Sequence, residues 1–309
     1  METVLARVRP RAISARRFRQ LATLSVLAIY VVVTTGAVVR LTASGLGCDN
    51  WPRCGDTPFP EKGGHAFVEF GNRVVSLGAI LVALACWLAS RRVPALTPQT
   101  RRTALAVFVA TAAQIPLGGV TVIFELHPVL VMSHFLLALA ALGLAVVVAL
   151  DAWSAAGGRG APLGPHWWRQ LALLGVPLAA ALVVTGAVSS ASGPHSGGED
   201  IRRLGLSIVD AVYVHVRVAA AFGVGLLVLT AWLARRRREA PGVAALAGSL
   251  LAVLVAQAVL GEVQYRSHLP WGLVLVHVSL AAAIWAGTVA LVYALWRPPA
   301  PLLSRAPSA

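Results

Sequence analysis

The sequence is poor in charged residues, and this scarcity excludes an ordinary soluble protein. Only 12% of its 309 residues are charged and 58% are hydrophobic, whereas a soluble domain carries about a quarter charged residues. Acidic residues are the scarcest, with 12 Asp and Glu against 26 Lys and Arg. Apolar stretches of about 20 residues recur instead along the chain, and this is the length that a helix needs to cross a bilayer.

Three common kinds of site are also missing. The glycine-rich segment 192–198 has no Lys-Ser or Lys-Thr pair and no preceding strand, so it is not a phosphate loop. Near Cys48 and Cys54 only His65 is a further metal ligand, which is too few for a zinc site. The net charge of +14 lies in clusters between apolar segments, a pattern typical of membrane proteins, so we expect no nucleic-acid partner.

The hydropathy predicts eight transmembrane helices and therefore an all-α membrane protein. The predicted spans are Leu21–Val39, Phe67–Ala89, Thr103–Ile123, Val129–Leu150, Gln170–Ser190, Ala211–Leu233, Val243–Leu260 and Trp271–Trp296. The arginine clusters fall on one side of these spans, which predicts an inner-membrane protein with both termini in the cytoplasm. The first span follows an arginine-rich start without a small-residue cleavage site, so we expect it to be retained.

An internal repeat divides the spans into two sets of four. The repeated residues are Thr35-Gly36-Ala37-Val38 with Thr185-Gly186-Ala187-Val188, and then, at one fixed offset, Gln114 with Gln257, Gly118 with Gly261 and His134 with His277. Units with an even number of spans have the same orientation in the membrane. We therefore expect two pseudo-symmetric four-helix bundles, residues 21–150 and 170–296, with cytoplasmic segments 1–20, 151–169 and 297–309.

Three histidines, His134, His215 and His277, fall within the predicted spans at similar depth. Ionisable residues inside a bilayer are costly and usually mark function. Neutral imidazole is the usual axial ligand of haem iron, and helical bundles build such sites from inward-facing side chains. A lone histidine would more simply bond a neighbouring helix, but three at one depth favour iron ligation. The second half then has two ligands, and the first half has only His134.

The second and sixth spans differ in the residues that could bind a porphyrin or react with it. Aligned on Arg73 and Arg217, the first half has Asn72 near the place of His215, and it also has Glu69. Glu69 either pairs with Arg73, one turn away, or accepts protons beside the porphyrin. The two arginines either bind haem propionates or extend to the membrane surface. The asymmetry indicates a cofactor half and a substrate half.

Cys48 and Cys54 flank a short segment of the first outer loop. The outer side of an inner membrane is oxidising, so a disulfide is expected there. The sequence leaves open whether this pair is structural or redox-active. Cys86, within the second span, is expected to pack in the core.

Taken together, these residues resemble the haem A synthase family over nearly the whole chain. The resemblance rests on Thr35–Thr42, Gly45–Cys48, Trp51–Cys54, Glu69, Asn72, Arg73, Gln114–Gly119, His134, Thr185, Gly186, Gly193–Gly197, His215, Gln257, Gly261 and His277. It implies an oxidoreductase that converts the C8 methyl of haem O to a formyl group by successive hydroxylations, for cytochrome c oxidase assembly.

The resemblance also implies roles for particular residues. His215 and His277 match the axial ligands of a haem b, and His134 matches a ligand of the substrate iron. Glu69 matches a glutamate important for activity, and Cys48 and Cys54 match the loop cysteines. Many members carry a histidine where this chain has Asn72, which puts six-coordinate binding of the substrate in question. Expected partners are haem O, the farnesyltransferase that makes it, an unidentified electron donor and the lipid bilayer.

Two other functions fit parts of the sequence. A membrane electron carrier would need only the bis-His haem b of the second half, and it would not explain the third histidine and the cysteine loop. A transporter built from a duplicated unit would have broken helices with charged residues near the midplane. In this chain the polar residues gather instead near the outer ends of the spans.

Overall fold

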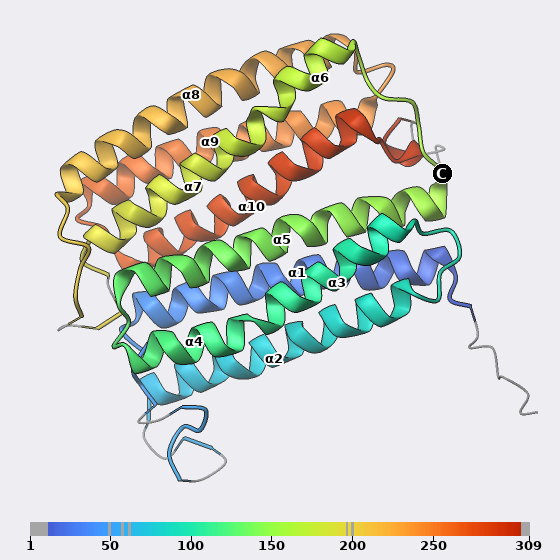
Figure 1. The fold of residues 1–309 in the computed structure, drawn as a ribbon. Coiled ribbons are helices and arrows are strands. Elements are labelled where there is room, and N and C mark those ends of the chain that lie inside the picture. The colour runs from blue at the N-terminus through green and yellow to red at the C-terminus, as the bar shows by residue number, and fades with distance from the viewer. Residues whose placement is uncertain are drawn as a thin grey trace, which may run out of the picture.

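The computed structural model describes residues 12–48, 51–56, 59–60, 63–195, 197–198 and 201–303, and these residues form helices and no strand. The helices are α1 (Ala15–Leu41), α2 (His65–Ser90), α3 (Pro98–Ala112), α4 (Gln114–Ile123), α5 (Pro128–Gly157), α6 (His166–Leu173), α7 (Gly175–Ser192), α8 (Ile208–Arg235), α9 (Pro241–Arg266) and α10 (Trp271–Trp296), followed by a short 3-10 helix, Ala300–Leu302. Figure 1 shows them running roughly side by side along one direction.

Among the described residues, eight helical segments are long and apolar enough to cross a membrane, which confirms the predicted all-α membrane fold. The eighth has the predicted bounds, and most of the others extend a few residues further. The third segment consists of α3 and α4, and the fifth consists of α6 and α7. The protein is therefore a multi-pass membrane protein.

Proline explains both interruptions. Pro116 and Pro177 lie near the starts of α4 and α7, and a proline has no N–H to bond the carbonyl four residues earlier. Those earlier residues are Ala112 and Leu173, where α3 and α6 end. At each break, one carbonyl therefore lacks its usual helical N–H partner. The chain then continues across the membrane as a second helix. No charged residue accompanies either junction, contrary to what the transporter alternative predicts.

Most contacts between helices fall within two groups, α1 to α5 and α6 to α10. In the first group α1 contacts α2 and α5, and α3 contacts α2 and α5; in the second, α7 contacts α8, and α9 contacts α8 and α10. The first group forms the lower layer in Figure 1 and the second forms the upper layer. Each group has its own buried apolar cluster. That the two bundles are related by an axis along the membrane normal remains a prediction.

Helix α10 joins the two groups, because it contacts α1 and α5 as well as α7 and α9. The Trp285 indole donates from Nε1 to the Leu139 carbonyl at 2.7 Å, and the Tyr30 hydroxyl donates to the Ser279 carbonyl at 3.1 Å. These side chains connect α10 to α5 and α1.

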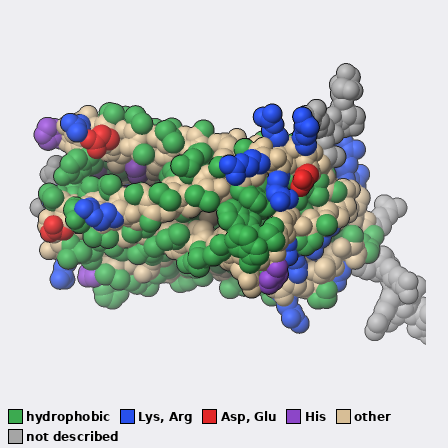
Figure 2. All heavy atoms as spheres, turned by 90° about the horizontal axis from the view of Figure 1, so that it is seen from above, with side chains coloured by type: hydrophobic (Ala, Val, Ile, Leu, Met, Phe, Trp, Pro, Cys, Tyr) green, Lys and Arg blue, Asp and Glu red, His purple; other side chains and the backbone are tan. Residues whose placement is uncertain are grey.

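A buried carboxylate connects the same groups at the end of the molecule where the chain termini lie. Asp151 of α5 accepts hydrogen bonds from Thr100 at 2.8 Å, Tyr293 at 2.7 Å and Arg159 at 2.7 Å. Basic side chains gather toward this end on the face shown in Figure 2, where Arg235, Arg237 and Arg238 are exposed. This distribution agrees with the arginine clusters on which the predicted orientation rests.

Candidate functional site

The three histidines lie near the N-terminal ends of their helices, at the end of the molecule away from the termini. His134 and His277 occupy equivalent places in α5 and α10, which begin at Pro128 and Trp271. The turns before these two helices also match. Glu125 and Leu126 have φ angles of 48° and 55°, and the corresponding residues before α10 have φ angles of 61° and 59°. The repeat read from the sequence is therefore also present in the backbone.

The two histidines of the second half face each other. The ring centroids of His215 and His277 are 6.4 Å apart, with 57° between the ring planes. A metal–imidazole bond is about 2 Å long, and a ring nitrogen lies about 1 Å from its centroid, so two rings that share one metal atom have centroids roughly 6 Å apart. The observed spacing fits a single iron atom between the two imidazoles.

A hydrogen bond orients the His215 imidazole, and another holds the backbone at His277. His215 Nδ1 lies 3.1 Å from Thr185 Oγ1. The Thr185 hydroxyl lies 2.8 Å from the Ala181 carbonyl, to which it donates, so it can accept from Nδ1–H, and Nε2 would then be free to bind a metal. Gln257 donates from Nε2 to the His277 carbonyl at 2.8 Å and fixes that turn of α10.

A glycine lies beside each imidazole. A Cβ added at Gly186 would lie 3.0 Å from His215 Cε1, and one added at Gly118 or Gly261 would lie 3.3 Å from Cε1 of His134 or His277. A larger residue at these positions would displace the rings. Gly118, Gly186 and Gly261 are thus explained by close approach of a helix backbone to a histidine.

Several buried polar atoms near these histidines have no partner among the described residues. They are Nδ1 of His134 and His277, both amide atoms of Gln114, and Oε1 of Gln257. An unsatisfied buried polar group costs about 1–3 kcal/mol, and each such group needs an explanation, such as a ligand or water. Together with the histidine spacing, these atoms are compatible with a bound porphyrin, whose iron the imidazoles would hold.

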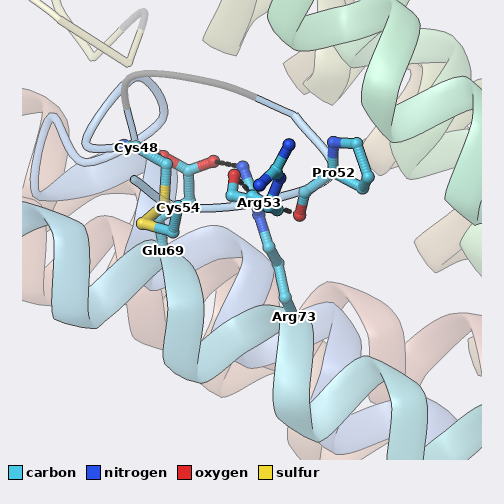
Figure 3. Close-up of a disulfide and its surroundings, with 6 residues drawn as sticks. All are labelled: Cys48, Pro52, Arg53, Cys54, Glu69 and Arg73. Atoms are coloured by element: carbon cyan, nitrogen blue, oxygen red, sulfur yellow. Dashed lines mark hydrogen bonds and ion pairs between the residues drawn. A yellow bond between two sulfur atoms is a disulfide. The ribbon is translucent and has the colours of Figure 1, made fainter. Parts of the chain in front are cut away.

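Glu69 and Arg73 form the predicted ion pair, at 2.5 Å, and together they hold the first outer loop. The Glu69 side chain is nearly buried, and it accepts from the Cys48 backbone N–H at 2.9 Å. Arg73 donates to the carbonyls of Pro52 and Arg53 at 3.0 Å and 2.9 Å. In Figure 3 both side chains rise from α2 toward this loop. The ion-pair interpretation is confirmed, and a part in proton transfer stays a prediction.

The expected disulfide between Cys48 and Cys54 is present, and its loop packs on α4. A Cβ added at Gly119 would lie 2.7 Å from the Trp51 ring, so Gly119 is the surface on which this indole rests. The adjacent Gly118 contacts His134. The disulfide loop therefore lies over the part of the first half that contains His134, an arrangement that the sequence did not predict.

Two arginines, Arg217 and Arg40, make contacts that the sequence did not predict. Arg217 bonds the Tyr213 carbonyl at 3.3 Å, and its guanidinium carbon lies 3.1 Å from the centroid of the Tyr213 ring. Arg40 was assigned no role by the sequence analysis, yet it donates to the carbonyls of Ser190 and His195 in the second half. In the sequence, Arg40 lies two residues after the repeated Thr-Gly-Ala-Val motif, within the segment Thr35–Thr42 that carries part of the family resemblance.

Known proteins resemble this chain over most of its length. A family model described as cytochrome oxidase assembly protein matches residues 19–64 and 59–289. A protein of Symbiobacterium thermophilum named haem A synthase is 32% identical over 275 residues, which are 82% of this chain and 88% of that protein. A haem A synthase of Shewanella oneidensis is 25% identical over 312 residues, 86% of this chain and 93% of the relative.

A third relative is longer than this chain. It is a protein of Thermus thermophilus named protohaem IX farnesyltransferase, and it is 30% identical over 280 residues. These residues make up 82% of this chain but only 44% of the relative.

Proposed function

Because the chain belongs to the haem A synthase family of cytochrome oxidase assembly proteins, we propose that it oxidises the C8 methyl of haem O to a formyl group by successive hydroxylations. The observation that carries this proposal is the unequal pair of histidine sites. The second half has His215 and His277 at the spacing of two ligands to one iron. The first half has only His134, which suits a porphyrin that must enter and leave.

We further propose that the resident haem is haem b, held by His215 and His277. A haem with both axial positions filled supplies one-electron transfer. The protein's own residues set the geometry: Thr185 orients the His215 ring, and Gly186 and Gly261 let the helix backbones approach the two imidazoles. Gln257 holds the backbone of α10 at His277.

In the first half, His134 is the proposed ligand of the substrate iron and Glu69 the proposed proton acceptor. The Trp51 indole of the disulfide loop packs on Gly119, next to the glycine that approaches His134, and would shield this side of a bound porphyrin. Arg73 and Arg217 remain the proposed contacts of haem propionates, because their guanidinium groups match a carboxylate. Arg73 would then serve a second purpose besides its bonds to the loop.

The proposed setting is the inner membrane, with both termini in the cytoplasm and the disulfide loop on the oxidising side. Haem O would come from a protohaem farnesyltransferase. A match between this chain and part of a longer protein with that name supports the two activities working in succession. The electrons would come from a donor that neither sequence nor structure identifies.

A pyridine haemochrome spectrum of the purified protein tests this function. The protein is expressed with and without a haem O-producing farnesyltransferase. We expect haem b alone without that enzyme, and haem A in its presence. Haem b under both conditions would favour the electron-carrier alternative. The variant His134→Ala serves as the control, because it should keep haem b and lose haem A.

A further inference from the structure

At one position of the internal repeat, the second half has a candidate iron ligand and the first half does not. One constant offset in residue number relates His134 to His277, Gln114 to Gln257 and also Asn72 in α2 to His215 in α8. Asn72 therefore stands where the second half has an iron ligand.

The contacts of Asn72 confirm this equivalence. Thr35 Oγ1 donates to Asn72 Oδ1 at 2.7 Å, and Thr185 Oγ1 lies 3.1 Å from His215 Nδ1. Thr35 and Thr185 are the first residues of the repeated Thr-Gly-Ala-Val motif. The threonine that begins the motif thus contacts an amide in the first half and an imidazole in the second half.

The neighbouring glycines show the consequence for space. A Cβ added at Gly186 would lie 3.0 Å from the His215 ring, whereas one added at Gly36 would meet no atom within 4 Å. The shorter side chain of Asn72 therefore leaves open the volume that an imidazole fills in the second half.

Asparagine also differs from histidine in its chemistry. The lone pair of the amide nitrogen is delocalised into the carbonyl, so Nδ2 donates hydrogen bonds and does not bind iron as an imidazole does. Thr35 already occupies Oδ1, and among the residues that the structure describes none accepts a hydrogen bond from Nδ2.

We propose that Asn72 leaves one axial position of the first-half iron open to a small exogenous ligand, to which the amide Nδ2 donates a hydrogen bond. This inference rests on the proposed function, because it requires a porphyrin bound by His134. Asn72 then determines the coordination state of the first-half iron. The two halves differ in having an open or a filled axial position, as well as in their number of histidine ligands.

Carbon monoxide is the probe for the test. The reduced protein, purified after co-expression with the farnesyltransferase, is titrated with carbon monoxide, and the haem content is measured by haemochrome. We expect one of the two bound haems to take up carbon monoxide and the other to remain low-spin. Asn72→His should abolish carbon monoxide binding while keeping both haems.

The variant Asn72→Leu isolates the hydrogen bond. It should still bind carbon monoxide, but the infrared C–O stretch should shift because the donor is gone. Two low-spin haems that bind no carbon monoxide in the unaltered protein would overturn the inference and leave the proposed function intact. A protein that never acquires a second haem, and never forms haem A, would overturn both.

Discussion

Arg40 of α1 donates from Nε to the main-chain oxygen of His195, 2.9 Å away, and so connects the first half of the chain to the second. The same guanidinium donates to the carbonyl of Ser190 at 3.0 Å, in the last turn of α7. Carbonyls at a helix end have no partner within the helix, and a cation there is favourable. His195 in turn bonds the Leu269 carbonyl through Nε2, at 2.7 Å.

We expect Arg40→Met to destabilise the protein by about 2–4 kcal/mol, since a hydrogen bond to a charged group contributes about 1.5–3 kcal/mol. The measurement is thermal unfolding in detergent. Arg266→Met is the matched control, because Arg266 forms an exposed pair with Glu262 that contributes about 0–1 kcal/mol. Equal shifts in the two variants would show that the Arg40 contacts contribute little.

The histidine variants should separate the two halves. His215→Ala and His277→Ala should each lose most of the haem b, because one remaining imidazole holds the iron weakly, whereas His134→Ala should retain it. The measurement is haem content per protein after purification. His268→Asn is the control, since His268 is exposed and its positive φ suits asparagine. Retention of haem b in His215→Ala would argue against the assigned ligands.

Thr185→Val should weaken haem binding without removing a ligand. Loss of a partner that orients a metal-bound histidine typically costs about 10–100-fold in affinity. The measurement is the transfer of haem to apomyoglobin, and Thr35→Val is the matched control, because Thr35 contacts Asn72 instead of a histidine. If both variants release haem b at the same rate, the Thr185 contact does not orient the ligand.

Glu69 and Arg73 can be distinguished by their effects on turnover and on the loop. Both Glu69→Gln and Arg73→Met should speed reduction of the Cys48–Cys54 disulfide by a phosphine, because each removes part of the attachment of the loop to α2. If Glu69 also transfers protons, haem A formation should fall much further in Glu69→Gln than in Arg73→Met. Equal losses would instead assign Glu69 to holding the loop.

Asp151 should matter for stability rather than for chemistry. Asp151→Ala leaves Thr100, Tyr293 and Arg159 without their shared acceptor, and we expect a loss of about 2–4 kcal/mol. Asp151→Asn keeps an acceptor oxygen and should cost less. Both variants should bind haem b normally once folded, as judged by the haemochrome spectrum, and specific loss of haem would contradict this assignment.

The sequence by itself determined the features that depend on one segment at a time. Apolar runs of membrane-spanning length predicted eight helices, because an isolated helix can cross a bilayer only if its own residues are apolar. The fixed offset between His134 and His277 revealed the repeat. The breaks before α4 and α7 follow from Pro116 and Pro177 and were within reach of the same reasoning, since the missing N–H is a local property.

Only the tertiary structure decided what these segments do to one another. Three contacts join residues from different loops and helices. Trp51 packs on Gly119, the Cys48 N–H donates to Glu69, and Arg40 donates to the His195 carbonyl. Hydropathy does not encode such pairings, because a buried polar group is satisfied by whichever partner the packing brings near. Only the structure, likewise, shows that Asn72 contacts Thr35 and that His215 contacts Thr185, the first residues of the repeated motif.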